Sequence, residues 1–431
     1  MSHGAGTRSA GSGRRIARTA GWLLVVGAAF LPVLPNPPLS TGTYLQAVEP
    51  TRAVLARIEP SPRALVAEVH DSMGELVARV ASPTARRHAV PIEGLRPGRE
   101  YTFTMRDADG ASLDSGRLRT AAVDDAQIVR FLVVGDSGKV PWWAWLQDTP
   151  ALYLPARYEW LPDAGEVTAV GRAMAKWPVD LWFHVGDVIY PYGEHRHYAA
   201  GFFRPFGDLL RQAPCYAVIG NHDHDTNRAR PFTQNFVVAP NSVSGDRRMF
   251  SFRDGPVRFI GIDLNRTFDA SHPSYRFLEQ ELSHAAEPWV VVLSHPPVFS
   301  ASRQTDRRDL IRHLAPLLRR YRVDLYLCGH DHNYQRFGKP GEPIYVVSGG
   351  GGKSLYELRH HTKLEAAYAG WQFVAVEVDG PVMRLQCVGL DGNPIDRLTI
   401  DKRMLDRSQV FGPTGNSARD QRVRALLDGD R

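Results

Sequence analysis

Cysteine is scarce in this chain. The 431 residues contain three, Cys215, Cys328 and Cys387, which lie far apart and inside apolar runs. Such spacing offers no disulfide framework, so we expect three buried thiols. The uncharged apolar run at residues 20 to about 35 is shorter than the roughly 20 residues that a membrane-spanning helix needs. Neither a disulfide-stapled small protein nor a multi-span membrane protein is therefore indicated.

A concentrated basic patch is also missing. The formal net charge is +6, from 52 Lys and Arg against 46 Asp and Glu, and basic and acidic residues are interleaved through most of the chain. The clearest basic segments are at the two ends, around Arg14 and Arg15 and around Lys402 and Arg403. A nucleic-acid partner is disfavoured because its binding surface would need clustered positive charge. The mild positive balance favours small anionic substrates.

The N-terminus carries a targeting pattern. Arg14, Arg15 and Arg18 precede the apolar run, and prolines crowd residues 32–38. A basic region followed by a short apolar core resembles a signal peptide. We expect residues 1–40 to be a signal peptide or N-terminal membrane anchor with a Pro-rich linker, and the protein to be periplasmic, secreted or membrane-tethered. The export route and any cleavage point stay open.

Residues 41–122 have the pattern of a small all-β domain. Segments 64–69 and 75–80 alternate apolar and polar residues, as antiparallel strands do. A turn at residues 95–100 is followed by Tyr101, Phe103 and Met105 on one strand face. This arrangement resembles the late strands of a fibronectin type III sandwich, with a tyrosine corner.

Residues 126–400 predict a second, larger domain with an α/β sandwich fold. Continuous apolar runs alternate with segments of helical periodicity, which is typical of buried sheets covered by helices. The runs are at 128–134, 180–185, 215–219, 257–262, 289–293, 323–327 and 344–347, and the helical segments are at 166–177, 274–287 and 309–321.

Five short polar motifs follow five of these runs. Because strand ends in such folds share an edge, the motif side chains are expected to meet. The motifs are Gly135-Asp136-Ser137-Gly138, Gly186-Asp187-Val188-Ile189-Tyr190, Gly220-Asn221-His222-Asp223, Ser294-His295 and Gly329-His330-Asp331-His332.

Together these motifs supply carboxylate, imidazole, amide and phenol donors, which suit iron, manganese or zinc and not Cu(I). Asp187 is placed to bridge two ions, since Tyr190 flanks it on one side and Asn221 on the other. Paired ions of this kind turn water into a nucleophile and neutralise a phosphoryl group under attack. The motifs therefore predict a phosphoester hydrolase.

The order and spacing of the five motifs resemble the purple acid phosphatase branch of the calcineurin-like metallophosphoesterases, over roughly residues 43–400. The larger members of that branch also carry a fibronectin-like domain before the catalytic one. The resemblance implies that Asp136, Tyr190 and His332 hold Fe(III), while Asn221, His295 and His330 hold a divalent Zn, Mn or Fe ion. Asp187 would be shared. The implied reaction is hydrolysis of phosphate monoesters by a metal-bound hydroxide, an acid phosphatase activity.

Proton delivery is assigned to His222, next to the ligand Asn221, either as the acid for the leaving group or as a donor to the phosphoryl group. Asp223 is predicted to orient it. In larger relatives another histidine follows the fourth motif, but here Pro296 and Pro297 follow His295. His195, His197 and His224 are weaker candidates for that role, and His184, His284 and His313 are interpreted as structural.

Alternatives remain within and outside this class. A phosphodiesterase acting on cyclic nucleotides or phospholipid head groups could use the same metal scaffold. A protein serine/threonine phosphatase is disfavoured, because residues 188–193 lack the Asp-Arg-Gly pattern of that branch. A fibronectin-bearing surface binding protein with a degenerate catalytic domain would be expected to have lost ligands, and none is lost here.

Two further segments flank or interrupt the predicted domains. Residues 139–163 hold many aromatic residues without clear periodicity, and we expect them to pack against the neighbouring sandwich rather than to form a loop over the site. Residues 401–431 form a charged tail, which is expected to be loosely ordered. The sequence does not indicate an oligomeric state.

Overall fold

The structure, a computed structural model, describes residues 39–138, 165–238, 245–406, 410 and 417–428. The predicted signal or anchor segment and the aromatic segment at 139–163 lie outside these residues. Within the described ranges, no helix is long and apolar enough to cross a membrane. The described residues belong to one compact unit.

The N-terminal part is all-β, as predicted. Its sheet has the order β1-β2-β4-β5, with β3 paired to β2. The register shifts between Ile58 and Leu65, so that the first part of β2 pairs with β1 and the second part with β4. One apolar cluster, including Leu55, Val90 and Phe103, serves both parts of this sheet. The strands are β1 (Tyr44–Gln46), β2 (Arg52–Asp71), β3 (Leu76–Glu93), β4 (Glu100–Asp107) and β5 (Ser112–Arg119).

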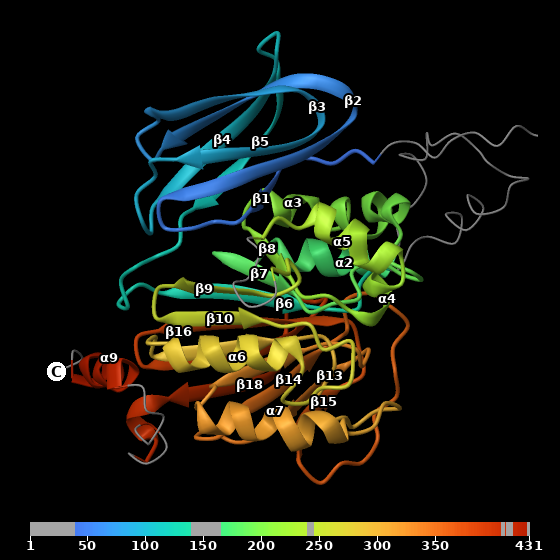
Figure 1. The fold of residues 1–431 in the computed structure, drawn as a ribbon, viewed down its shortest axis with the longest axis vertical. Helices are drawn as coiled ribbons and strands as arrows, with labels where there is room; N and C mark the ends of the chain where they lie inside the picture. Colours follow the sequence, from blue (N-terminus) through green and yellow to red (C-terminus); the bar gives the residue numbers. More distant parts are fainter. Residues whose placement is uncertain (1–38, 139–164, 239–244, 407–409, 411–416, 429–431) are drawn as a thin grey trace, which may run out of the picture. The chain divides into compact units, whose positions relative to one another are not determined.

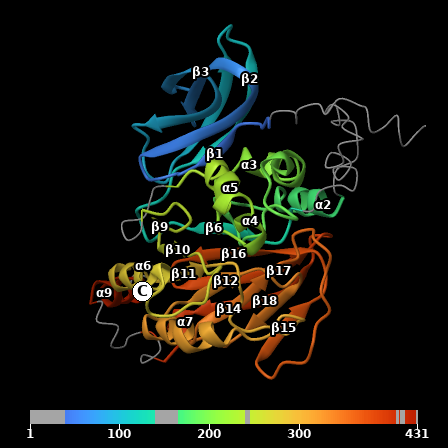
Figure 2. The same cartoon turned by 45° about the vertical axis from the view of Figure 1, so that its right-hand side comes forward.

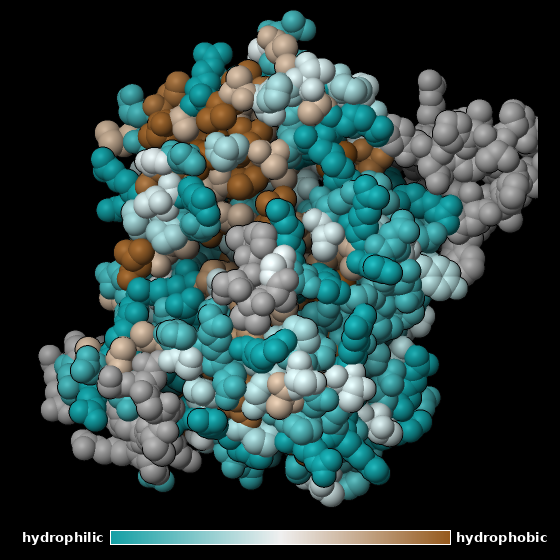
Figure 3. All heavy atoms as spheres, in the orientation of Figure 1, coloured by the Kyte–Doolittle hydropathy of each residue, from teal (hydrophilic) through white to brown (hydrophobic). Residues whose placement is uncertain are grey.

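Two features of this β domain stand out. The Tyr101 hydroxyl group accepts a hydrogen bond of 2.9 Å from the backbone N–H of Arg96, five residues upstream, which is the predicted tyrosine-corner contact. Several apolar side chains gather on the visible face of this domain, among polar ones (Figure 3). Met73, Leu76 and Val77, at the turn between β2 and β3, are among its exposed large apolar side chains.

The catalytic part contains two sheets. The first has the order β18-β17-β16-β6-β7-β8 and the second β15-β13-β14-β12-β11-β10-β9. In the first, β6, β7 and β8 are parallel, and in the second β10, β11, β12 and β14 are parallel. The first sheet comprises β6 (Val129–Val134), β7 (Leu181–His184), β8 (Cys215–Ala217), β16 (Gln372–Asp379), β17 (Val382–Gly389) and β18 (Pro394–Asp401). The second comprises β9 (Phe250–Asp254), β10 (Val257–Gly261), β11 (Trp289–Leu293), β12 (Leu325–Cys328), β13 (Tyr334–Phe337), β14 (Ile344–Ser348) and β15 (Leu364–Tyr368).

A shared apolar layer joins the two sheets, and helices cover their outer faces. Phe131 and Phe183 of the first sheet and Val291 of the second belong to one buried cluster. Helix α2 (Gly165–Met174), together with η5 (Ala199–Phe203) and α3 (Gly207–Leu210), packs on the first sheet. Helices α6 (Pro273–His284) and α7 (Arg308–Arg320) pack on the second. The predicted α/β sandwich is confirmed, and its layers are visible in Figures 1 and 2.

The β domain shares part of its core with the catalytic domain. Tyr44 belongs to the apolar cluster that contains Trp182 and Phe206, and its ring centroid lies 5.0 Å from that of Phe203. The Tyr216 hydroxyl group accepts from the backbone N–H of Val48 at 3.1 Å. The two domains predicted from the sequence are therefore packed together by apolar and polar contacts.

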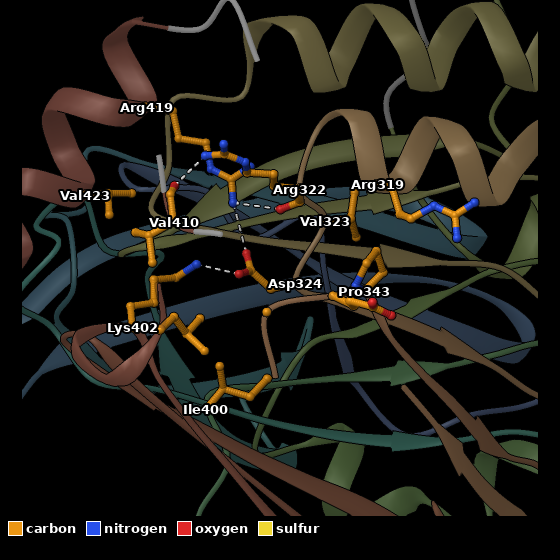
Figure 4. Close-up of a pocket in the computed structure, with 13 residues that line it drawn as sticks. Arg319, Arg322, Val323, Asp324, Pro343, Ile400, Lys402, Val410, Arg419 and Val423 are labelled. Atoms are coloured by element: carbon orange, nitrogen blue, oxygen red, sulfur yellow. Dashed lines mark hydrogen bonds and ion pairs between the residues drawn. The ribbon is translucent and has the colours of Figure 1, made fainter. Parts of the chain in front are cut away.

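The C-terminal tail is more ordered than expected. Residues Ser417–Asp428 form helix α9, and Arg419 of this helix is buried. Its guanidinium group donates to the carbonyl of Tyr321 at 2.7 Å and forms an ion pair with Asp324 at 3.0 Å, while Lys402 of η7 (Lys402–Met404) pairs with the same carboxylate. Figure 4 shows both cations pointing at Asp324 in a pocket of about 240 Å³. The expectation of a loosely ordered tail is wrong for these residues, because α7 needs donors at its C-terminus and a buried carboxylate needs cationic partners.

Candidate metal centre

The seven predicted ligands come from loops at the strand ends of both sheets. Asp136 and Asp187 follow β6 and β7, and Asn221 begins α4 (Asn221–His224) after β8, all on the first sheet. His295 follows β11, and His330 and His332 follow β12, on the second sheet. The carboxyl ends of these parallel strands meet at one edge, so residues far apart in the sequence converge there.

The Tyr190 hydroxyl group is the meeting point of one set of donors. It lies 2.9 Å from Oδ2 of Asp187, 3.1 Å from Oδ1 of Asp136 and 3.1 Å from Nε2 of His332. All four side chains are buried. A phenol, two carboxylates and an imidazole thus point their donor atoms at one position.

A second set of donors surrounds Nε2 of His295. This atom lies 3.4 Å from Oδ1 of Asp187, 3.2 Å from Oδ1 of Asn221 and 3.2 Å from Nδ1 of His330. Donor atoms of Asp187, His295 and His330 all lie within 4.8 Å of one another. The two carboxylate oxygens of Asp187 therefore face different sets, Oδ2 toward Tyr190 and Oδ1 toward His295.

Backbone carbonyls accept hydrogen bonds from the ring nitrogens that point away from the centre in two of the histidine ligands. Nδ1 of His295 donates to the carbonyl of Val185 at 2.9 Å, and Nδ1 of His332 donates to the carbonyl of Ser354 at 2.6 Å. Each bond leaves Nε2 of the ring directed into the centre, the usual support of a metal-binding histidine.

Backbone amides hold the two carboxylates in the same way. The N–H of His330 donates to Asp136 at 2.8 Å, and that of His222 donates to Asp187 at 3.0 Å. The orientation of each carboxylate is therefore set by the turn that carries a neighbouring motif.

The local backbone explains the shape of the motifs. Asp136, Asp187 and His330 have φ values of 56°, 53° and 69°, in a left-handed region that costs a non-glycine residue about 1–3 kcal/mol and that clusters at functional sites. A Cβ atom on Gly220 would lie 2.1 Å from the backbone nitrogen of Asp187, and one on Gly329 would lie 2.4 Å from Oδ2 of Asp136. Glycine before these motifs lets the loops approach one another.

Burial controls the charges at this centre. It raises the pKa of Asp136 well above its ordinary value and lowers that of His330 to about 3 and that of His332 to about 4. Burial also opposes charge on Asp187 and His295, but their mutual attraction outweighs it, lowering the pKa of Asp187 and raising that of His295 to about 10. Without a metal ion, these two side chains form an ion pair.

The raised pKa of Tyr190 indicates that its phenol needs a nearby cation to ionise. Burial, followed by the charges of Asp136 and Asp187, raises the pKa of its phenol well above 10. The phenol consequently stays protonated unless a cation offsets the carboxylates. Two carboxylates, three imidazoles, an amide oxygen and a phenol, arranged in two sets around Asp187, fit a pair of hard or borderline metal ions.

His222 lies beside the centre and is partly open to solvent. Its Nδ1 donates to the carbonyl of Pro191 at 2.6 Å, its Nε2 lies 3.9 Å from Oδ2 of Asp187, and its side chain is 35% exposed. Its ring also contacts that of Tyr190, with centroids 4.5 Å apart. Nδ1 is thus anchored to the backbone, and Nε2 is the ring nitrogen near Asp187.

Asp223 has a different role from the predicted one. Its buried carboxylate accepts hydrogen bonds from the backbone N–H groups of Val188, Ile189 and Gly220, at 3.1, 3.2 and 3.0 Å. The carbonyl of Pro191, and not Asp223, orients the His222 ring. These amides belong to two loops, one after β7 and one after β8, so Asp223 ties the loop that carries Asp187 to its own loop.

The other candidate histidines pair away from the ligands. Nε2 of His195 lies 2.7 Å from Arg87, that of His197 lies 3.2 Å from Glu194, and that of His224 lies 3.2 Å from Asp263. The structural interpretation of His184 agrees with its burial and with its 2.7 Å hydrogen bond to Ser137, and that of His284 agrees with its contact to its own helix.

A further loop at the centre was missed in the sequence analysis. Residues 349–356 follow β14, and Nζ of Lys353 lies 4.2 Å from the centroid of the Tyr190 ring. The ring of Tyr356 stacks on that of the predicted ligand His332, with centroids 3.9 Å apart. Four consecutive glycines, which follow the apolar run at 344–347 after Ser348, were the available signal for another strand-end loop.

Comparisons with known proteins found similarity to phosphoesterases. Residues 129–334, which include all seven predicted ligands, match the family model described as Calcineurin-like phosphoesterase. The chain is 25% identical over 313 residues to tartrate-resistant acid phosphatase type 5 of Rattus norvegicus, covering 64% of this chain and 92% of the relative. It is 25% identical over 265 residues to purple acid phosphatase 7 of Arabidopsis thaliana, covering 54% of this chain and 80% of the relative. Among solved structures, purple acid phosphatase PPD1 from yellow lupin (Lupinus luteus) seeds superposes with a TM-score of 0.70 at 19% identity, covering 89% of this chain and 77% of that one.

Proposed function

We propose that this chain, a calcineurin-like phosphoesterase related to the purple acid phosphatases, hydrolyses phosphate monoesters at a centre of two metal ions. The observation that carries the proposal is the position of Asp187, whose two oxygens face two separate sets of donors. A shared carboxylate between two such sets is what a bimetallic hydrolytic centre requires. His222, whose side chain is 35% exposed, lies beside this centre.

The donor chemistry divides the centre into two halves. Asp136, Tyr190 and His332 would hold one ion, and we propose Fe(III) there, because a hard trivalent ion keeps a phenol ionised. The remaining ligands, Asn221, His295 and His330, would hold Zn, Mn or Fe(II). When bound, the two ions activate water as a nucleophile and offset charge on the phosphoryl group.

Proton transfer is the contribution of His222. Its Nδ1–H is held by the carbonyl of Pro191, so Nε2 is directed toward the substrate side of Asp187. When protonated, Nε2 can donate to the leaving oxygen or to a phosphoryl oxygen. Asp223 is given no direct part, because its carboxylate accepts from the backbone N–H groups of Val188 and Gly220.

The central experiment combines metal analysis with a substrate panel. The purified, oxidised protein should contain iron and a second metal, show a visible phenolate-to-Fe(III) absorption band, and hydrolyse monoesters faster than diesters. Tyr190→Phe should lose the band. Asp187→Asn should lose metal, and it should lose more activity than substitution of a ligand to one ion only, such as His332. The reason is that it removes charge shared by both ions.

Each result has a contrary outcome. Two zinc ions and no band would overturn the iron assignment while sparing hydrolysis. Activity confined to diesters would favour the phosphodiesterase alternative. A metal-loaded protein without activity on either class would support the binding-protein alternative.

We also propose that the β domain is fibronectin type III-like and that the protein acts outside the cytoplasm. The hydrogen bond from the Arg96 backbone to Tyr101 supports the first proposal, and the basic residues before the apolar run at 20–35 support the second. Fractionation of cells expressing the full chain, with N-terminal sequencing of the mature protein, tests export. Recovery of the uncleaved protein from the cytosol alone would contradict it.

A further inference from the structure

A pocket with a basic lining lies beside the C-terminal helix. It measures about 240 Å³ and is formed by the end of α7, the residue before β12, the end of β18 with η7, and α9 (Figure 4). Four Arg and Lys against two Asp and Glu give its lining a net charge of +2. These charged residues are Arg319, Arg322, Lys402, Arg419, Asp324 and Glu342.

Two of the cations are buried and share one carboxylate. Lys402 and Arg419 are each only 6% exposed. Lys402 forms an ion pair with Oδ1 of Asp324, and Arg419 forms one with Oδ2 at 3.0 Å. Charges removed from water are costly unless partners compensate for the lost hydration, and here one carboxylate serves two cations.

Arg322 adds a third cation next to this pair. Burial lowers the pKa of its guanidinium group, and the charge of Arg419 lowers it further. The carboxylates of Asp420 and Asp324 act in the opposite direction. Burial also lowers the pKa of Lys402, against the attraction of Asp324. Positive charge is thus held here at a cost in free energy that a bound anion would reduce.

Arg322 also occupies a position that glycine commonly fills. Helix α7 ends in a Schellman turn, in which the N–H of Val323 donates to the carbonyl of Leu318 at 2.9 Å. In the same turn the N–H of Arg322 donates to the carbonyl of Arg319 at 3.1 Å. Arg322 has a φ of 50°, a left-handed conformation that costs a residue other than glycine roughly 1–2 kcal/mol. Such strain indicates a use for the side chain beyond the turn itself.

The pocket is separate from the metal centre. Asp324 directly precedes β12, whereas His330 and His332 follow the other end of that strand. The four residues of β12 extend about 13 Å, so the pocket and the centre lie at opposite ends of the strand. An ion in this pocket is therefore not the group that reacts.

We propose that this pocket is a second, non-catalytic site that binds a free phosphate ion. Arginine presents N–H donors in a planar fork that matches phosphate oxygens, and a doubly charged ion balances the charge of +2 on the lining. A phosphate ion here would contact α9, η7 and the end of α7 at once. Its binding should consequently hold the C-terminal helix in place. Such binding does not require hydrolase activity.

Hydrogen exchange of the metal-loaded full chain tests this, with phosphate compared with chloride at equal ionic strength. Phosphate at about ten times its Kd should slow exchange of the backbone amides of α9 and of residues 318–323 about tenfold. Sulfate, a dianion of similar shape, should act in the same way. In Arg322→Gly the protection should fall to about twofold, the value for a tenfold weaker site. Glycine suits the φ of 50°, so the turn should be kept.

Arg320→Gln is the matched control. Arg320 is a neighbouring arginine at the end of α7, but its side chain is 66% exposed and pairs with Glu279. This variant should keep the full protection of α9 by phosphate. Phosphate bound at the metal centre would slow exchange near Asp187 and His222 instead, equally in all three proteins.

The outcomes separate this site from the hydrolase proposal. Equal protection of α9 in Arg322→Gly and in the unaltered protein, or none in either, would overturn the site. Stronger protection by citrate than by phosphate would overturn the choice of phosphate. A protein that hydrolyses no phosphoester but loses the protection of α9 in Arg322→Gly would uphold the site and contradict the hydrolase proposal alone.

Discussion

At the scale of single residues, the centre is built from side chains that each have a second partner. The outer nitrogens of His295 and His332 donate to backbone carbonyls, and that of His222 donates to the carbonyl of Pro191. A ring held at one nitrogen can present the other in one direction only. The orientation of these histidine rings therefore depends on backbone carbonyl groups as well as on the predicted ligands themselves.

His222 is the residue whose substitution is most informative about proton transfer. His222→Ala should slow hydrolysis of alkyl phosphates about 100-fold or more, the range of general acid help, and should slow nitrophenyl phosphate much less, because that leaving group is stable as an anion. Steady-state rates on both substrates, with metal analysis, provide the measurement. His224→Ala is the control, since His224 pairs with Asp263. Equal losses on both substrates would make His222 a phosphate-binding donor.

His184 should make the metal-free protein sensitive to acid. Burial lowers its pKa from 6.5 to about 3, so the unfolded chain takes up a proton below pH 6.5 while the folded protein does not. Stability is consequently present above pH 6.5 and lost as the pH falls toward 3, by about 2 kcal/mol between pH 7 and pH 5.

His184→Leu tests this prediction. The quantity compared is the change in the free energy of unfolding between pH 7 and pH 5, and not the free energy of unfolding at one pH. Denaturant unfolding of chelator-treated protein at pH 7 and pH 5 should show a smaller pH difference for the variant, by about 2 kcal/mol. An identical difference in both proteins would show that His184 is not the titrating group.

At the scale of elements, the site is a property of strand ends. Each of β6, β7, β8, β11 and β12 is a short buried strand followed by a tight turn, and those turns carry the ligands. The turns can pack against one another because glycines precede Asp136, Asp187, Asn221 and His330. At four of these five strand ends the same pattern recurs: a buried strand, then a glycine, then a predicted ligand.

Gly220→Ala should disrupt the centre without adding or removing a ligand. Its Cβ would lie 2.1 Å from both the backbone nitrogen and Oδ1 of Asp187, so the loop that holds the shared carboxylate must move. We expect metal content and activity to fall strongly. Gly165→Ala is the matched control, because its Cβ would meet nothing within 4 Å and alanine favours a helix. Full metal content in Gly220→Ala would mean that the loops are less tightly packed than the distances indicate.

At the scale of the whole molecule, the β domain and the catalytic domain support each other. Tyr44 packs against Phe203, and Tyr216 bonds to the backbone of Val48. All seven predicted ligands nevertheless lie in the catalytic domain. The β domain can thus affect the centre only through the stability of the first sheet and its helices.

A shortened protein beginning at Ala121 should keep the ligands but lose stability. Removal of Tyr44 alone exposes the ring of Phe203, and large aromatic deletions in cores cost about 3–5 kcal/mol. We expect a markedly lower Tm in the metal-free state, with metal binding retained if the protein stays soluble. Tyr44→Ala in the full chain should reproduce part of the loss. A Tm equal to that of the full chain would show that the two domains are independent.

The sequence by itself predicted most of the buried strands, the three longer helices of the second domain and a candidate ligand set. Apolar runs and helical periodicity predicted β6, β7, β8, β10, β11, β12 and β14 and the helices α2, α6 and α7, because burial of one face imposes a local pattern along the chain. The antiparallel strands β9 and β13 were not predicted. The positions of Asp136, Asp187, Asn221, His295 and His330 after those runs predicted where they meet. The helix at 417–428 was missed, since Arg419 is ordered by carbonyls and a carboxylate distant in sequence.

Only the tertiary structure showed how the predicted ligands are distributed between the two sheets. It placed Asp136, Asp187 and Asn221 on one sheet and the histidine ligands on the other, and it turned the two oxygens of Asp187 toward different donors. It also moved Asp223 from the chemistry to the support of a loop, and brought cations from α7, η7 and α9 to one pocket. Local spacing encodes strands and turns, whereas contacts across two packed sheets depend on side chains that no short sequence window contains.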